Sequence, residues 1–150
     1  MLHEAAKCDN LTTVKLCMQL GAKVECQDDK GQTALHKAAK HSTAALAEYF
    51  VQAGADIDVQ DNDGRSALVV AIGASSEAVT KFLLSAGAAL VIVFRDPSRS
   101  STRYYHNVVD YAKMVADSRE SRRPGTSEAK QAERICRHLR RLSDGRKSVE

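Results

Sequence analysis

Small and apolar residues recur at a fixed spacing of 33 residues through the first two-thirds of the chain. One column contains Leu2, Leu35 and Leu68, and each leucine is followed three and four residues later by two small or aliphatic residues. A second column has the same spacing and consists of glycines: Gly21, Gly54 and Gly87. A fixed period of this length predicts an array of similar units, each of which packs on its neighbours. The most regular unit spans residues 31–63.

This central unit predicts two short helices followed by a loop. Thr33 can cap a first helix over 34–40, and a break of polar residues separates it from a second helix with an apolar face over 44–53. Gly54 follows, where a residue in the left-handed conformation commonly ends a helix. Residues 56–64 alternate between polar and apolar and finish in turn-forming residues, which predicts an extended segment and then a projecting loop or β-hairpin.

The third unit departs from this pattern at residues 90–94, whose sequence LVIVF has no polar position. A continuous apolar strand needs cover on both faces. Either the chain itself covers the strand, or a partner or a second copy of the chain does. The second alternative predicts self-association through residues 90–94 and makes Val91, Val93 and Phe94 candidates for a secondary interaction surface.

Residues 95–106 are an insertion relative to the period and are rich in proline, serine and arginine. This composition predicts an extended hairpin tip or a mobile loop, with phosphorylation of its serines as a regulatory alternative. The repeat pattern resumes at Val109-Asp110-Tyr111-Ala112. We expect one helix over 108–119, a loop over 121–127, a last helix over 128–142 capped by Thr126 or Ser127, and a frayed tail over 143–150.

The segments Gly31-Gln32-Thr33-Ala34-Leu35-His36-Lys37-Ala38-Ala39 and Ala53-Gly54-Ala55-Asp56-Ile57 resemble an ankyrin repeat, with Ala34 in the position of the family's proline. The resemblance implies an all-α solenoid of helix–turn–helix units with short β-hairpin loops, in which His3 and His36 bond structurally to neighbouring loops. It predicts a single domain of three clear repeats and a diverged, capping fourth. The units are expected at about 1–30, 31–63, 64–96 and 107–142.

The resemblance also implies a non-catalytic module that binds a partner protein through its hairpin tips and the concave face of its first helices. The family's contact positions fall here on Gln27, Asp28, Asp29, Lys30, Gln32, Lys37, Lys40, His41, Gln60, Asp61, Asn62, Asp63 and Arg65, with Lys7 and Cys8 in the first unit. The third unit instead offers Val70, Gly73 and Ala74, a smoother surface that suits an apolar partner chain.

Charge adds one alternative to this interpretation. The net charge is +3, but residues 1–94 hold 8 Lys/Arg against 11 Asp/Glu, whereas residues 95–150 hold 14 against 8. The last predicted helix carries Arg134, Arg137 and Arg141, which could bind nucleic acid or an anionic membrane electrostatically. Because no aromatic residues lie between these arginines, we expect a protein partner rather than nucleic acid. The chain could also be a regulatory or targeting segment of a larger protein or enzyme.

The sequence gives no indication of catalysis. It contains no nucleophile elbow, no phosphate-binding loop and no zinc-protease motif, and the spacing of Cys8, Cys17 and Cys26 fits no zinc site. We therefore expect no catalytic residue, metal, cofactor or small-molecule substrate. The absence of a secretory signal and of an apolar run of membrane-spanning length predicts an intracellular protein, cytoplasmic or nuclear.

Overall fold

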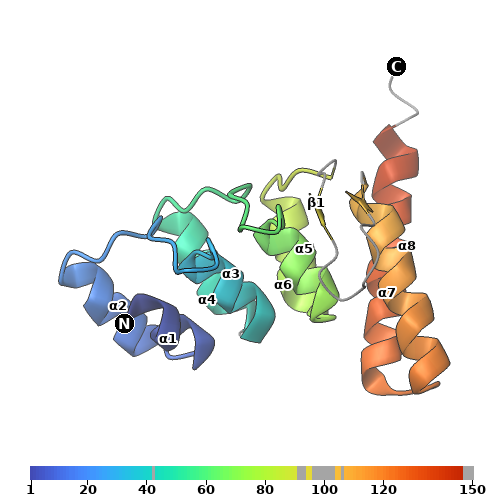
Figure 1. Ribbon diagram of the computed structural model, residues 1–150, viewed down its shortest axis with the longest axis horizontal. Coiled ribbons are helices and arrows are strands. Elements are labelled where there is room, and N and C mark those ends of the chain that lie inside the picture. Colours follow the sequence, from blue (N-terminus) through green and yellow to red (C-terminus); the bar gives the residue numbers. More distant parts are fainter. Residues whose placement is uncertain (42, 91–93, 96–103, 106, 147–150) are drawn as a thin grey trace.

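The computed structural model describes residues 1–41, 43–90, 94–95, 104–105 and 107–146. Helices follow one another in pairs that stand side by side along a row (Figure 1). The pairs are α1 Leu2–Lys7 with α2 Leu11–Gln19, α3 Ala34–His41 with α4 Ala44–Gln52, α5 Ala67–Gly73 with α6 Glu77–Ser85, and α7 Val108–Arg122 with α8 Ser127–Arg146. The predicted all-helical stack of helix–turn–helix units is confirmed.

Stacking follows the leucine and alanine columns of the sequence. Helix α1 packs on α3, α3 on α5, and α5 on α7, while α4, α6 and α8 form the second row. Leu35 and Leu68 are buried between units, and the alanines Ala38 and Ala39 are fully buried where neighbouring helices approach. A unit of two short helices buries little apolar surface by itself, so these contacts between units supply most of the stability.

The loops between units are closed by turns that hydrogen-bond to one another. The N–H of Gly31 donates to the carbonyl of Asp28 at 2.8 Å, and the N–H of Asn62, in the next loop, donates to the carbonyl of Lys30 at 3.0 Å. Gly31 has φ +70°, and a Cβ on it would lie 2.9 Å from the backbone nitrogen of Asn62, so only glycine fits there. In contrast to the predicted extended segment, residues 57–58 form a turn.

The helix boundaries that differ most from the prediction are those of the last two helices. Helix α7 continues to Arg122, which shortens the expected loop to residues 123–126, and α8 continues to Arg146 instead of ending at residue 142. Part of the expected tail is therefore helical. The predicted cap is confirmed for Thr126, whose hydroxyl accepts a hydrogen bond from the N–H of Ala129 at 3.3 Å.

The inserted segment begins and ends in a short antiparallel pair of strands. Strand β1, Phe94–Arg95, pairs with β2, Tyr104–Tyr105, with Phe94 opposite Tyr105. Next to this pair, the N–H of Val108 donates to the carbonyl of Leu90 at 3.0 Å and joins the two ends of the insertion. Val91 and Val93 lie outside the described residues, as do residues 96–103, and the side chain of Phe94 is not described. Self-association through residues 90–94 therefore stays a prediction.

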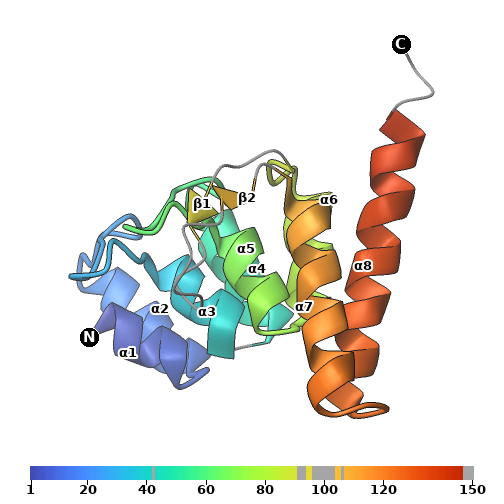
Figure 2. The same ribbon diagram turned by 45° about the vertical axis from the view of Figure 1, so that its right-hand side comes forward.

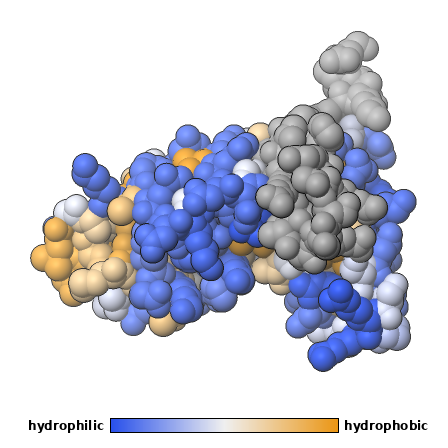
Figure 3. Space-filling model, in the orientation of Figure 1, coloured by the Kyte–Doolittle hydropathy of each residue, from blue (hydrophilic) through white to orange (hydrophobic). Residues whose placement is uncertain are grey.

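On the face that Figure 3 shows, most residues are hydrophilic, and a large apolar area lies at the N-terminal end of the row. There, Leu16 and Leu20 on and after α2 are 54% and 75% exposed. None of the described helices combines the length and the apolar character needed to cross a lipid bilayer.

A candidate binding groove on the concave face

A groove of about 800 Å³ runs across the first helices of successive units, from α1 over α3 and α5 to α7. Figure 2 shows α1, α3, α5 and α7 following one another along the stack. Its lining residues are Glu4, Lys7, Asp29, Lys30, Gln32, Lys37, Lys40, His41, Asn62, Asp63, Arg65, Val69, Val70, Gly73, Ala74 and Tyr111.

The groove is built on one column of the repeat. Glu4, Lys37 and Val70 are spaced by 33 residues and all line it. Tyr111 holds the same place in the diverged fourth unit, two residues after Val109, and also lines the groove. The column therefore changes from charged side chains at one end of the groove to an aliphatic and then an aromatic side chain at the other.

Most of the predicted contact residues line this groove. They are Asp29, Lys30, Gln32, Lys37, Lys40, His41, Asn62, Asp63 and Arg65, together with Lys7, Val70, Gly73 and Ala74. Sequence reasoning missed Glu4, Val69 and Tyr111. The alignment of Val109–Ala112 with the repeat motif contained the signal for Tyr111, because it places this tyrosine in the column of Lys37.

The remaining predicted residues of the tips are Gln27, Asp28, Gln60 and Asp61, and they do not line the groove. The Asp28 carboxylate accepts hydrogen bonds from the N–H groups of Lys30 and Gln32, both at 2.9 Å, and lies 2.6 Å from Nζ of Lys37. Partial burial opposes ionisation, but Lys37 and the two N–H groups outweigh it and lower the pKa of Asp28 to about 2. The carboxylate thus fixes both its own turn and the position of Lys37.

Asp61 repeats this arrangement one unit later, with its side chain fully buried. Its carboxylate accepts hydrogen bonds from Nε and Nη2 of Arg65 at 3.0 and 2.8 Å, and from Nε2 of Gln32 at 3.1 Å. Burial raises the pKa of this carboxyl, but the bonds from Arg65 and Gln32 outweigh it, so the pKa of Asp61 lies below its ordinary value. Asp61 holds Gln32 and Arg65 in place and is not itself available at the surface.

Positive charge gathers where α1 and α3 meet in the groove. His41 is exposed, but partial desolvation of its ring lowers its pKa, and the nearby ammonium groups of Lys40, Lys7 and Lys37 lower it further. Lys40 is exposed and forms no ion pair within the described part of the chain. This end of the groove therefore offers an uncompensated cation.

The other end of the groove is apolar. Val69 is buried in its floor, while Val70 and Ala74 are partly exposed beside it. The groove thus combines a cationic end on α1 and α3 with an apolar end on α5 and α7.

The arginines of the last helix lie outside the groove. Arg134 is 3.7 Å from Glu77 on α6, Arg137 pairs with Glu133 at 3.0 Å, and Arg141 is exposed. Two of the three predicted arginines therefore already have a carboxylate partner. Among the described residues, no three His, Cys, Asp or Glu side chains are grouped so as to hold a metal ion.

The family model for ankyrin repeats in three copies matches residues 2–93, more than half of the chain. The chain belongs to the ankyrin-repeat family. The resemblance seen in the sequence is thereby confirmed. Ankyrin repeats are in general protein–protein interaction modules, and the fold is typically non-catalytic.

Solved structures agree with this assignment. The chain is similar to the human ASB11 ankyrin repeat domain, with 28% sequence identity and a TM-score of 0.57 over 60% of this chain. It spans 41% of that domain's length. No curated protein matches the chain significantly in sequence.

Proposed function

We propose that this chain is a non-catalytic binding module whose concave groove holds a segment of a partner protein. The observation that carries the proposal is the column Glu4, Lys37, Val70 and Tyr111, which lines one groove across four successive units. These side chains lie beside the buried stacking positions, so their identities are free to suit a partner. A groove that crosses several units fits an extended chain, as the concave surfaces of solenoids generally do.

Several groove side chains are held in place before any partner arrives. Lys37 contacts Asp28 at 2.6 Å and donates to Oε1 of Gln32 at 2.7 Å. Arg65 contacts both Asp61 and Asp63, at 2.8 and 2.9 Å. Because these side chains have already lost rotamer freedom, binding a partner costs less conformational entropy. Lys40 and Lys30, which form no ion pair among the described residues, remain available to a partner's acidic groups.

An intracellular setting, cytoplasm or nucleus, is part of this proposal. The thiols of Cys8 and Cys26 are free and exposed, which suits a reducing compartment. Such a setting is common among ankyrin-repeat proteins.

The test is a quantitative pull-down from an extract of the source cells with matched pairs of variants. Val70→Lys places a charge on the apolar end of the groove, and Val51→Lys makes the same change at a partly buried valine on α4. Lys40→Glu reverses a groove lysine that has no ion-pair partner among the described residues, and Lys113→Glu reverses an exposed lysine of α7 outside the groove. We expect the two groove variants to lose a protein that the two control variants retain.

Equal recovery of every captured protein by groove and control variants would contradict the proposal. Circular dichroism and thermal unfolding of all four variants separate loss of binding from loss of fold. Reversal of Asp61 or Arg65 is unsuitable for this purpose, because their pairing is partly buried and supports the loop itself.

A further inference from the structure

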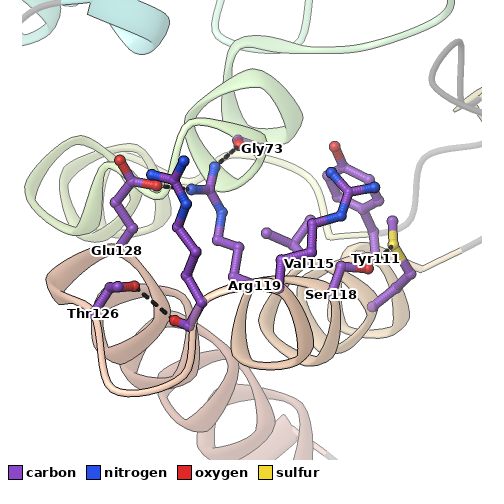
Figure 4. Close-up of a pocket in the computed structure, with 10 residues that line it drawn as sticks. Gly73, Tyr111, Val115, Ser118, Arg119, Thr126 and Glu128 are labelled. Atoms are coloured by element: carbon purple, nitrogen blue, oxygen red, sulfur yellow. Dashed lines mark hydrogen bonds and ion pairs between the residues drawn. The ribbon is translucent and has the colours of Figure 1, made fainter.

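A second pocket, of about 630 Å³, adjoins the apolar end of the groove. It lies between the end of α5 and the junction of α7 with α8, and it shares Gly73 and Tyr111 with the groove. Figure 4 shows the side chains of Tyr111, Ser118, Arg119, Thr126 and Glu128 around it. The groove and this pocket therefore meet at Tyr111.

Arg119 fixes the walls of this pocket. Its Nη2 donates to the carbonyl of Gly73 at 2.8 Å, and its Nη1 lies 2.6 Å from Oε2 of Glu128 (Figure 4). One guanidinium thus ties the C-terminal end of α5 to the start of α8. A positive charge at the end of α5 is also favourable for the helix dipole.

Two further arginines line the pocket without such partners. Arg122 and Arg123 are exposed, and neither forms an ion pair with any residue that the structure describes. Three arginines therefore line the pocket with a single carboxylate, that of Glu128. The Ser118 hydroxyl donates a hydrogen bond to the sulfur of Met114 at 3.5 Å, and a thioether sulfur is a weak acceptor. The pocket therefore has more hydrogen-bond donors and more positive charge than the described residues satisfy.

We propose that this arginine pocket binds the carboxylate of an acidic side chain carried by the same partner segment that occupies the groove. The inference rests on the proposed function. Guanidinium groups suit a carboxylate because their N–H groups form a planar fork that can donate two parallel hydrogen bonds. The partner segment then places an apolar residue on Val70 and Ala74, passes Tyr111, and places Asp or Glu in the pocket that Arg122 and Arg123 line.

The test selects ligands for the full chain from a phage-displayed library of random linear peptides. We expect the enriched peptides to share an apolar residue and an Asp or Glu at a constant spacing. The double variant Arg122→Gln/Arg123→Gln should bind these peptides about tenfold more weakly, as expected for the loss of a charge-assisted hydrogen bond. Arg140→Gln/Arg141→Gln, with the same change of net charge at exposed positions of α8 outside the pocket, should bind them as the unchanged chain does.

A double-mutant cycle then isolates the contact. Replacing the peptide's acidic residue by its amide should weaken binding to the unchanged chain about tenfold and leave binding to the Arg122→Gln/Arg123→Gln variant nearly unaffected. Arg122→Lys/Arg123→Lys keeps the charge and should retain more affinity for the acidic peptide than the glutamine variant does. Thermal unfolding of each variant confirms that the fold is intact.

The outcomes separate the two proposals. Peptides that lose binding on Val70→Lys, yet show no acidic preference and bind the glutamine variant normally, would overturn the arginine-pocket inference and leave the groove proposal standing. Selected peptides that are all indifferent to Val70→Lys would contradict the groove proposal itself.

Discussion

The Nε2–H of His36 donates a 2.9 Å hydrogen bond to the carbonyl of Arg65, so the first helix of one repeat holds the loop that leads into the next. The ring's Nδ1 accepts from the N–H and the hydroxyl of Thr33, at 3.2 and 2.9 Å. His3 makes the equivalent bond, 2.9 Å, to the carbonyl of Gln32. In the third unit this position is Val69, whose side chain has no hydrogen-bond donor. The loop that follows this third unit is the one that the insertion replaces.

Thr33 bonds to His36 in the second unit, whereas the third unit has Val69 in the histidine column. Ser66 therefore lacks the hydrogen-bond partner that Thr33 has. Ser66 occupies the column of Thr33, and its buried hydroxyl has no hydrogen-bond partner among the described residues. We expect Thr33→Val to lower the free energy of unfolding by about 1 kcal/mol, because it removes a buried hydrogen bond to His36. Ser66→Ala should leave it unchanged or raise it by up to about 0.5 kcal/mol. Urea denaturation of both variants measures the contrast, and an equal loss in the two would contradict this account.

The buried ring of His36 makes stability depend on pH. Burial lowers its pKa, although its hydrogen bond to Arg65 opposes the shift. The unfolded chain therefore binds more protons than the folded chain as the pH falls through the ordinary histidine value of about 6.5. We expect the contribution of His36 to the free energy of unfolding to be complete above this pH and to be lost progressively below it.

The pKa of His41 is lowered too, so it contributes in the same direction. Urea denaturation at about pH 7.5 and about pH 5.5 measures the combined effect. His41→Gln, at an exposed position, should keep the part of the decrease that comes from His36. A stability that rises on acidification over this range would show that the neutral ring is not what the fold requires.

Leu68 tests the stacking between units. Its side chain is fully buried, so Leu68→Ala should lower the free energy of unfolding by about 2–5 kcal/mol. Leu20 is 75% exposed, and the same substitution there should change stability by less than about 0.5 kcal/mol. Thermal or chemical unfolding of the two variants checks the difference. An unchanged unfolding curve for Leu68→Ala would argue against close packing at this column.

Two aspartates of the loop tips should respond differently to removal. Asp61→Ala removes a buried carboxylate that accepts five hydrogen bonds, four from its own loop and one from Gln32. We expect this change to lower the free energy of unfolding by roughly 3 kcal/mol. Asp29 is exposed and lines the groove, so Asp29→Ala should change stability by less than about 0.5 kcal/mol. A similar stability for both variants would show that Asp61 does not support the loop.

The fold could be predicted because its signals are local and repeated. The leucine and glycine columns mark the helices and their ends, and His3 and His36 have the structural role that the family resemblance implied. The extent of α8 could not be predicted, because Asp144-Gly145 is a strong turn signal. A single glycine costs a helix only about 1 kcal/mol, which is too little to end it at that point.

The candidate site was harder to predict than the fold. Asp28 and Asp61 occupy one column and bond to their own loops, whereas Asp29 and Asn62 occupy the next column and line the groove. Sequence alone places all four on the tips and does not tell which way each side chain turns. The arginine pocket lies where α7 packs beside the end of α5, and the residue spacing of the diverged fourth unit does not indicate how these two helices pack.

The most direct test of the groove is a map of backbone amide shifts by NMR when a peptide selected from the random library is added to the full chain. We expect the shifted amides to cluster in the tips and first helices, over residues 29–41, 62–74 and 111–123. Shifts confined to α2, α4 and α6, with those three stretches unaffected, would contradict the claim that this protein binds its partner through the concave face.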